Sequence, residues 1–209
     1  FAGAASTFTG SLNVAGGKVI FEGTGSLGGG NDVTLAGGTS IELGTAASEA
    51  TAATIGGLNS SGGAGSVIGG SANLSTLIFG PGSGTSTFTG TIGGGGANQN
   101  NLNLVKDGAG TQILDGAVSL AGTTLVQQGT LQFGTSATFA PGGAVSILAE
   151  DNSTAVLDIN GASFTTTGAT TLGGAGTAAT PQLVDTAGTG MVGPGGGGAF
   201  SAPQPTPGG

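Results

Sequence analysis

Short apolar runs punctuated by glycine make up most of this chain. Within each run, apolar residues alternate with small or polar ones, and Gly or Asn then interrupts the pattern. A period of two places every second side chain on the same face of a strand. Turn residues that recur about every 8–12 positions indicate many short strands. The pattern predicts strands at 12–14, 18–21, 32–35, 39–43, 118–120, 130–133, 145–147 and 156–159.

No segment predicts a helix. The most helix-compatible stretch, residues 45–53, is rich in Ala but short, and its apolar residues form no continuous face. The fold class that the pattern predicts is therefore all-β, with no helix of note.

The composition favours one kind of β architecture. The chain has 49 Gly among 209 residues, and no Trp or Tyr. A sandwich of this length normally contains larger core residues. A solenoid instead stacks short strands and has small residues at its corners. We therefore predict a β-solenoid of the parallel β-helix type. Coils of about 20–25 residues would give about eight to ten coils and, at ~4.8 Å per coil, a rod about 40–50 Å long.

Weak internal repetition divides the chain. Residues 6–10 and 86–90 share the sequence Ser-Thr-Phe-Thr-Gly, and 17–21 resembles 129–133. Similar segments keep their order while their spacing grows. We therefore predict degenerate Gly-rich repeats at about 6–82 and 86–182, inside a solenoid that spans 1–187. Residues 188–209, rich in Gly and Pro, are expected to form a C-terminal tail or arm.

Composition also excludes several functions. Only 6% of the residues are charged, the net charge is −8, and His and Cys are absent. Without them there is no imidazole base, thiol nucleophile or Cys/His zinc site. Two lysines cannot neutralise a phosphate backbone, and no apolar run approaches the ~18 residues of a membrane span. We expect no cofactor, no nucleic-acid partner and no membrane span.

The acidic residues provide only weak candidates for chemistry. Glu150 and Asp151 are adjacent, but neighbouring strand residues point to opposite faces, and the following Asn152-Ser153 predicts a turn. Asn31-Asp32 offers oxygen ligands without the spacing of a calcium loop. Asn152-Ser-Thr is also one of three glycosylation sequons, which a Ser- and Thr-rich chain contains by chance. We expect neither a catalytic nor a metal site.

The most specific motif lies within residues 104–134. Its positions are Lys106, Gly108, Gly110, Thr111, Gly116, Gly122, Thr123, Val126, Gly129, Thr130 and Leu131. This segment resembles the passenger-associated transport repeat, also called the autotransporter-associated β-strand repeat. The resemblance implies a β-helical, secreted bacterial surface protein in the extracellular space. It implies no catalytic activity.

Phenylalanines provide the candidate contacts between subunits. Phe21, Phe88, Phe133 and Phe139 fall in strand contexts that predict interior positions, as does Phe8. Phe1 and Phe200 lie in Gly- and Ala-rich segments near the ends of the sequence, where we expect them to dock on a neighbouring subunit. Phe8 is the third candidate contact, in an N-terminal strand that we expect around residues 1–8 to complete a neighbouring sheet.

These observations favour a structural function. A solenoid has open ends whose unpaired strands can template further pairing, and a head-to-tail contact that does not close gives a filament. We predict a non-enzymatic extracellular protein, the subunit of a surface fibre or matrix that assembles with itself by strand complementation. The alternatives are a monomeric passenger-type adhesin and, from another class, a polysaccharide-active β-helix enzyme.

Overall fold

The computed structural model describes residues 10–23, 27, 30–46, 50–175, 178–188, 192–194 and 200–201, the last two ranges by their backbone alone. Every regular element in these ranges is a β-strand, which confirms the predicted all-β class. Each of the eight predicted segments overlaps a strand. Across the same ranges, no helix is long and apolar enough to cross a bilayer.

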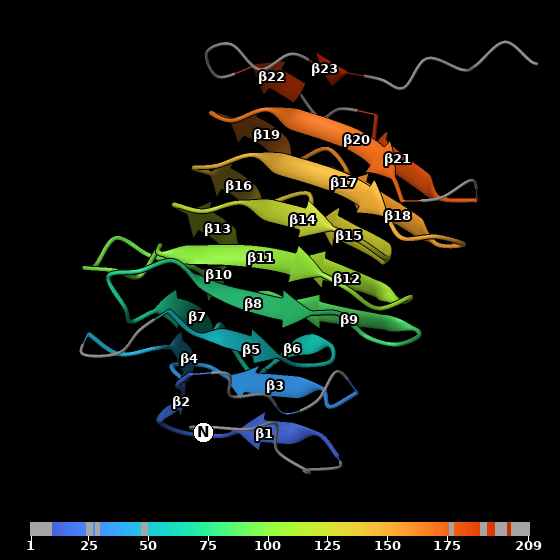
Figure 1. Ribbon diagram of the computed structural model, residues 1–209. Helices are drawn as coiled ribbons and strands as arrows, with labels where there is room; N and C mark the ends of the chain where they lie inside the picture. The colour runs from blue at the N-terminus through green and yellow to red at the C-terminus, as the bar shows by residue number, and fades with distance from the viewer. Residues whose placement is uncertain are drawn as a thin grey trace, which may run out of the picture.

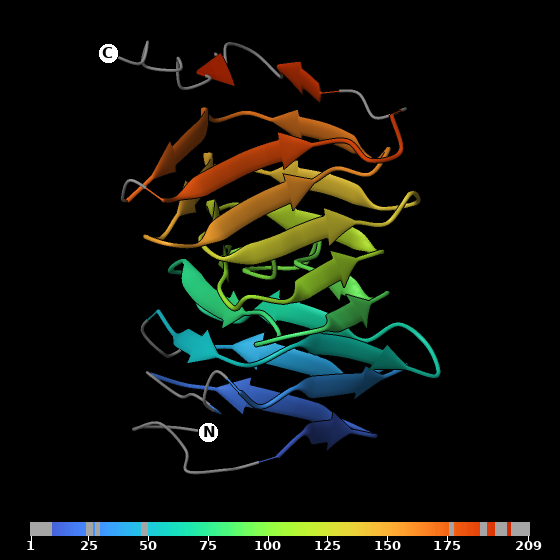
Figure 2. The ribbon, with the colours of Figure 1, turned by 90° about the vertical axis from the view of Figure 1, so that its right-hand side faces the viewer.

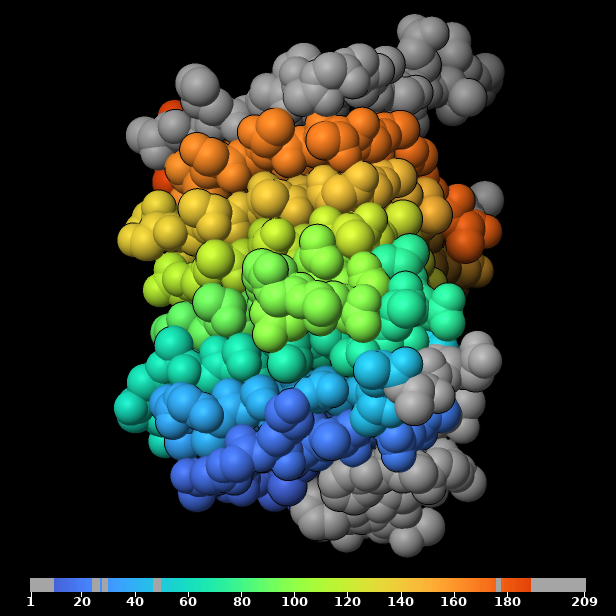
Figure 3. Space-filling view, turned by 90° about the vertical axis from the view of Figure 1, so that its left-hand side faces the viewer, coloured from blue at the N-terminus to red at the C-terminus, as the bar shows by residue number. Residues whose placement is uncertain are grey.

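The strands stack as a parallel β-solenoid with three faces (Figures 1 and 2). Each complete coil gives one strand to each face in turn, and each strand pairs in parallel with the equivalent strand of the next coil. Space filling shows the coils as successive colour bands along one axis (Figure 3). The predicted solenoid is therefore confirmed.

We name the faces by their sheets. The split face contains β1 (Leu12–Val14), β3 (Val33–Ala36) and β6 (Leu58–Ser61) in one sheet, and β9 (Thr85–Phe88), β12 (Thr111–Leu114), β15 (Gly129–Phe133), β18 (Thr154–Asp158) and β21 (Thr180–Val184) in another. The eight-stranded face contains β2 (Lys18–Phe21), β4 (Ser40–Leu43), β7 (Ser66–Gly69), β10 (Thr91–Ile92), β13 (Ala117–Leu120), β16 (Thr138–Pro141), β19 (Ser163–Thr166) and β22 (Val192–Pro194). The seven-stranded face contains β5 (Ala52–Thr54), β8 (Ser75–Phe79), β11 (Leu102–Lys106), β14 (Thr124–Val126), β17 (Val145–Ala149), β20 (Thr170–Gly174) and β23 (Phe200–Ser201).

Coil length varies more than the sequence pattern predicts. A short coil brings Thr130 into register with Thr111, whereas a much longer one separates Phe200 from its register partner Thr170. Because several coils are longer than expected, the described chain forms seven to eight coils, as the strand numbers of the two longest sheets show. This number lies at or below the lower end of the range we expected.

Inward-pointing side chains form the core as columns along the solenoid axis. On the split face, one column contains Leu12, Val33 and Leu58 in register, and further along Leu131, Leu157 and Leu183. Between the two end residues, the Leu and Val side chains of this column are fully buried. Each buried Leu or Val contributes about 1.5–3 kcal/mol relative to its exposed state, so stacking supplies most of the stability.

The expected interior phenylalanines are buried where the structure describes them. Phe21, Phe88, Phe133 and Phe139 are at most 3% exposed. They come from strands of different faces and so do not share one column. Phe139 stacks between Phe133 and Phe164, with ring centroids 4.5 and 5.5 Å away, which makes a short aromatic cluster in three adjacent strands, β15, β16 and β19. Phe8 lies outside the described residues.

Glycines at the corners let one coil rest directly on the next. A Cβ atom added to Gly116 would overlap the carbonyl oxygen of Gly90, and one added to Gly90 would overlap that of Gly65. At a second column of corners, Cβ atoms added to Gly143 and Gly168 would likewise overlap backbone atoms of the preceding coil. The backbones approach so closely at these corners that no larger residue fits.

Segments that resemble each other in sequence lie on different faces. Residues 17–21 contribute β2 to the eight-stranded face, whereas 129–133 form β15 on the split face. Their likeness therefore follows from a shared strand-and-turn pattern at different positions around the coil. The division into repeats at 6–82 and 86–182, and the boundary at 187, stay predictions; β22 and β23 pair with β19 and β20 by their backbones.

Replacing Gly116 by Ala should destabilise the fold, because the new methyl group meets the Gly90 carbonyl. We expect a loss of about 1–3 kcal/mol, the usual cost of overpacking, in urea unfolding followed by circular dichroism. Gly82→Ala is the matched control, since a Cβ there has no neighbour within 4 Å, and its unfolding free energy should stay the same or rise. Equal losses in both variants would contradict the role of the corners.

Candidate functional site

The predicted contact residues lie at or beyond the limits of the described chain. Phe1 and Phe8 fall outside the described residues. Phe200 belongs to β23, whose backbone is in register with Thr170 of β20. Their role in subunit contacts therefore stays a prediction.

Glu150 and Asp151 lie in a turn, as their sequence context predicts. Glu150 and Asp151 are exposed, and the Ser153 amide donates to the Glu150 carbonyl at 3.1 Å to close the turn. Asp32 accepts a hydrogen bond from the Gly57 amide at 2.6 Å, which links two coils. Within the described ranges, no group of three or more acidic residues is placed to hold a metal ion.

Lys106 is the most unusual charged residue of the structure. It ends β11 pointing inward, in register between Phe79 and Val126, and its side chain is fully buried. Its Nζ atom donates to the carbonyl oxygens of Gly108 at 2.6 Å and Gln128 at 2.9 Å. The alkyl chain thus fills a core position while the ammonium group ties its own corner to the next coil.

Burial has a cost for this ammonium group. Desolvation lowers the pKa of Lys106 to about 8, although the neighbouring charge of Asp107 acts in the opposite direction. The hydrogen bonds to two backbone carbonyls compensate part of the lost hydration. Lys106 is a residue of the sequence motif, but the motif alone does not show that it points inward.

Gln112 joins the two sheets of the split face. No backbone ladder connects β6 with β9, yet the Gln112 side chain reaches from β12 to β6. Its Oε1 accepts from the Leu58 amide at 2.9 Å, and its Nε2 donates to the Leu58 carbonyl at 2.7 Å. The side-chain amide therefore takes the place of a neighbouring peptide group.

The sequence contained a signal for this arrangement. Gln112 lies two residues before the buried Leu114 in β12. Side chains two positions apart in a strand point to the same face, so both point inward. The alternation alone does not place Gln112 in the core, because a polar side chain is buried only where it finds hydrogen-bonding partners, and its partner Leu58 comes from two coils away.

Asp158 forms the third buried polar centre. Its carboxylate accepts from Gln132 Nε2 at 2.7 Å and Thr186 Oγ1 at 2.8 Å, and from the amides of Asn160 and Thr186. Desolvation acts to raise the pKa of Asp158, but these four hydrogen bonds outweigh it and hold the pKa below its ordinary value. The carboxylate ties three coils together, which is a structural role.

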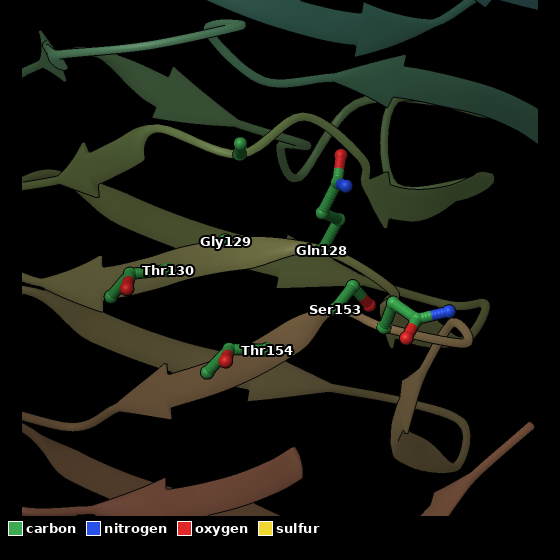
Figure 4. A pocket seen from close by; sticks show the side chains of 7 residues that line it. Gln128, Gly129, Thr130, Ser153 and Thr154 are labelled. Carbon is green, nitrogen blue, oxygen red and sulfur yellow. The ribbon is translucent and has the colours of Figure 1, made fainter. Parts of the chain in front are cut away.

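A surface cavity of about 290 Å³ lies at the corner between the seven-stranded and split faces. We call it the corner notch. Ala109, residues 128–130 and residues 152–154 line it, and Figure 4 shows Gln128 and Thr130 on one strand segment beside Ser153 and Thr154 on the next. Lys106 lies beneath it, because Gln128 contributes one of the two carbonyls that its ammonium group binds.

A stack of coils whose strands pair in parallel on three faces defines a β-helical protein. Comparison with known families gives a match to the passenger-associated transport repeat over residues 104–133, the segment that runs from β11 to β15. The chain is therefore a β-helical protein that carries an autotransporter-associated repeat. No curated protein matches the chain, and no solved structure does either.

Lys106 should give the protein an unusual alkaline pH dependence. The pKa is about 8 in the folded chain and about 10.5 when unfolded, so the unfolded state binds more protons between these values and stability rises with pH. We expect the free energy of unfolding to increase by on the order of 2–3 kcal/mol from pH 8 to about 10, measured by urea unfolding.

The sequence makes this measurement unusually direct. The chain has no His, Cys or Tyr, so no imidazole, thiol or phenol contributes to the pH profile in this range. A Lys106→Met variant should lose the increase, whereas Lys18→Met should keep it. A flat profile in the unsubstituted protein would show that Lys106 titrates normally.

Gln112→Met should weaken the middle of the solenoid. The substitution keeps the length of the side chain but leaves the buried amide and carbonyl of Leu58 without partners, which costs about 1–3 kcal/mol for each group. For the two groups together we expect the free energy of unfolding to fall by about 2–6 kcal/mol. The control Gln182→Met, at an exposed position of β21 on the same face, should change little, and comparable losses in both would refute the bridging role.

Proposed function

We propose that this protein is a non-enzymatic extracellular structural protein, a subunit of a surface fibre or matrix whose copies stack head to tail. The matched repeat occurs in autotransporter passenger domains, and together with the solenoid it fits an extracellular or surface location. The particular proposal of end-to-end stacking rests on the two ends of the solenoid.

The observation that carries the proposal is the inward column of the split face. Its members are buried along the stack, but Leu12 at one end and Leu183 at the other are only partly covered. Val19 near the first end, on the eight-stranded face, and Leu172 near the second end, on the seven-stranded face, are also only partly covered. Two copies placed end to end would bring Leu183 of one against Leu12 of the next and continue the column across the junction.

Charge contributes little to such a junction. The described ranges contain one ion pair, between Lys18 and Glu42 on neighbouring strands, and exposed pairs contribute roughly 0–1 kcal/mol. Apolar burial of about 1.5–3 kcal/mol per side chain, with strand pairing at roughly 0.5–1.5 kcal/mol per main-chain hydrogen bond, supplies more. The net charge of −8 opposes contact between copies, so added salt should not dissolve an assembly.

We expect the purified protein to form filaments visible by negative-stain electron microscopy, and Leu183→Gln to prevent them while leaving the monomer folded. The control is Leu148→Gln, at a 40% exposed position on the side of the stack, which should leave filaments intact. Filaments should also persist in about 0.5 M NaCl, where charges more than about 4–5 Å apart are screened.

Two results would overturn the proposal. A monomer by light scattering at high concentration would favour the passenger-type adhesin instead. Filaments that survive both Leu183→Gln and removal of residues 1–10, which include Phe1 and Phe8, would place the contact away from the ends of the stack.

A further inference from the structure

The corner notch results from one shortened corner between two longer ones. Lys106, Val126 and Ile147 are in register on the seven-stranded face, and Thr111, Thr130 and Val156 on the split face. Between these register positions the chain passes through residues 107–110, 127–129 and 148–155, which include the corners and the adjoining strand ends. The middle connection is the shortest of the three, and residues near all three connections line the notch.

The lining of the notch is polar and uncharged. The side-chain amides of Gln128 and Asn152 and the hydroxyl of Thr130 form no hydrogen bond with any described group, whereas Ser153 donates to the Glu150 carbonyl at 2.8 Å and Thr154 pairs with Thr180 at 2.7 Å. Ala109 is the only apolar side chain in the lining. The free groups include both donors and acceptors.

Several parts of the structure hold these groups in place. The Gln128 carbonyl is fixed from below by the Lys106 ammonium. Asn152 lies in a turn with φ of 58° that the hydrogen bond between Ser153 and Glu150 closes. Thr130 belongs to β15, which pairs with strands on both sides. A notch with a fixed backbone loses little freedom when it binds a ligand.

The charge around the notch restricts the ligand. Glu150 and Asp151 are exposed on the same turn as Asn152, so an anionic ligand would be repelled. An apolar ligand would find one methyl group and would leave the amides unpaired, which is unfavourable. From these features we infer that the corner notch is a binding site for a neutral, hydroxyl-rich saccharide unit, held by Gln128, Asn152 and Thr130.

This inference goes beyond the proposed function and does not depend on assembly. The cavity of about 290 Å³ is at the small end of ligand pockets, so it takes a single small unit of a longer chain. No aromatic side chain lines it. Affinity for one unit should therefore be weak, about millimolar, and an array of copies would increase it by multivalency.

Saturation-transfer-difference NMR with methyl glucoside, methyl mannoside and methyl galactoside tests the inference, with methyl glucuronide as the anionic comparison. The protein should first be shown by intact mass to carry no sugar on Asn152. We expect at least one neutral glycoside to bind with a millimolar Kd, and the glucuronide to bind about fivefold more weakly or not at all, given the two nearby carboxylates.

Substitutions then locate the site. Gln128→Leu and Asn152→Gly should each weaken binding about fivefold, the loss expected for one hydrogen bond, and Gly preserves the turn because it accepts positive φ. Thr111→Val, one coil away in the same outward column, should bind like the unsubstituted protein. No saturation transfer to any neutral glycoside, equal binding by the Gln128 and Asn152 variants, or tighter binding of the glucuronide would each overturn the inference.

Discussion

The whole structure depends on how closely one coil can lie on the next. A parallel ladder holds neighbouring strands about 4.8 Å apart, and the corners must follow the same spacing although they have no regular pairing. At Gly90 and Gly116 the corner backbone of one coil occupies the space that a Cβ atom of the next would need. Glycine at these positions therefore allows the strands on all three faces to stay in register, and only strands in register bring the inward side chains into continuous columns.

Because the coils are irregular, some buried backbone polar groups have no partner in the ladders. Three buried side chains provide hydrogen bonds inside the stack. Lys106 satisfies two corner carbonyls, Gln112 replaces a missing strand contact, and Asp158 collects four donors at the end of β18. In each case the polar group is buried with its partners, which is the condition under which burial is tolerated. The solenoid can therefore combine short and long coils without leaving most of its buried groups unpaired.

Local pattern was enough to predict the strands, the parallel stack and the turn at Glu150-Asp151, because each depends on residues close together in the sequence. The repeat motif includes Lys106 but does not predict that it is buried, because Lys side chains are almost always exposed. The bridge from Gln112 to Leu58 joins residues 54 positions apart, and the corner notch depends on the relative lengths of three successive corners. Such features require the register of the coils, which a single sequence does not provide. The phenylalanines near the ends lie where the described structure stops.

The bridge from Gln112 also bears on how the solenoid would respond to pulling. In an ideal repeat stack each coil contacts only its neighbours, so coils detach from an end one after another. Gln112 departs from that rule because it spans from β12 past β9 to β6, with a further contact to the Ser86 carbonyl on the way. Three consecutive coils are thereby coupled, and force applied along the axis would release them together as one larger extension step. Under such a load the outer coils would separate first, and the coupled block of three coils would stay intact longest.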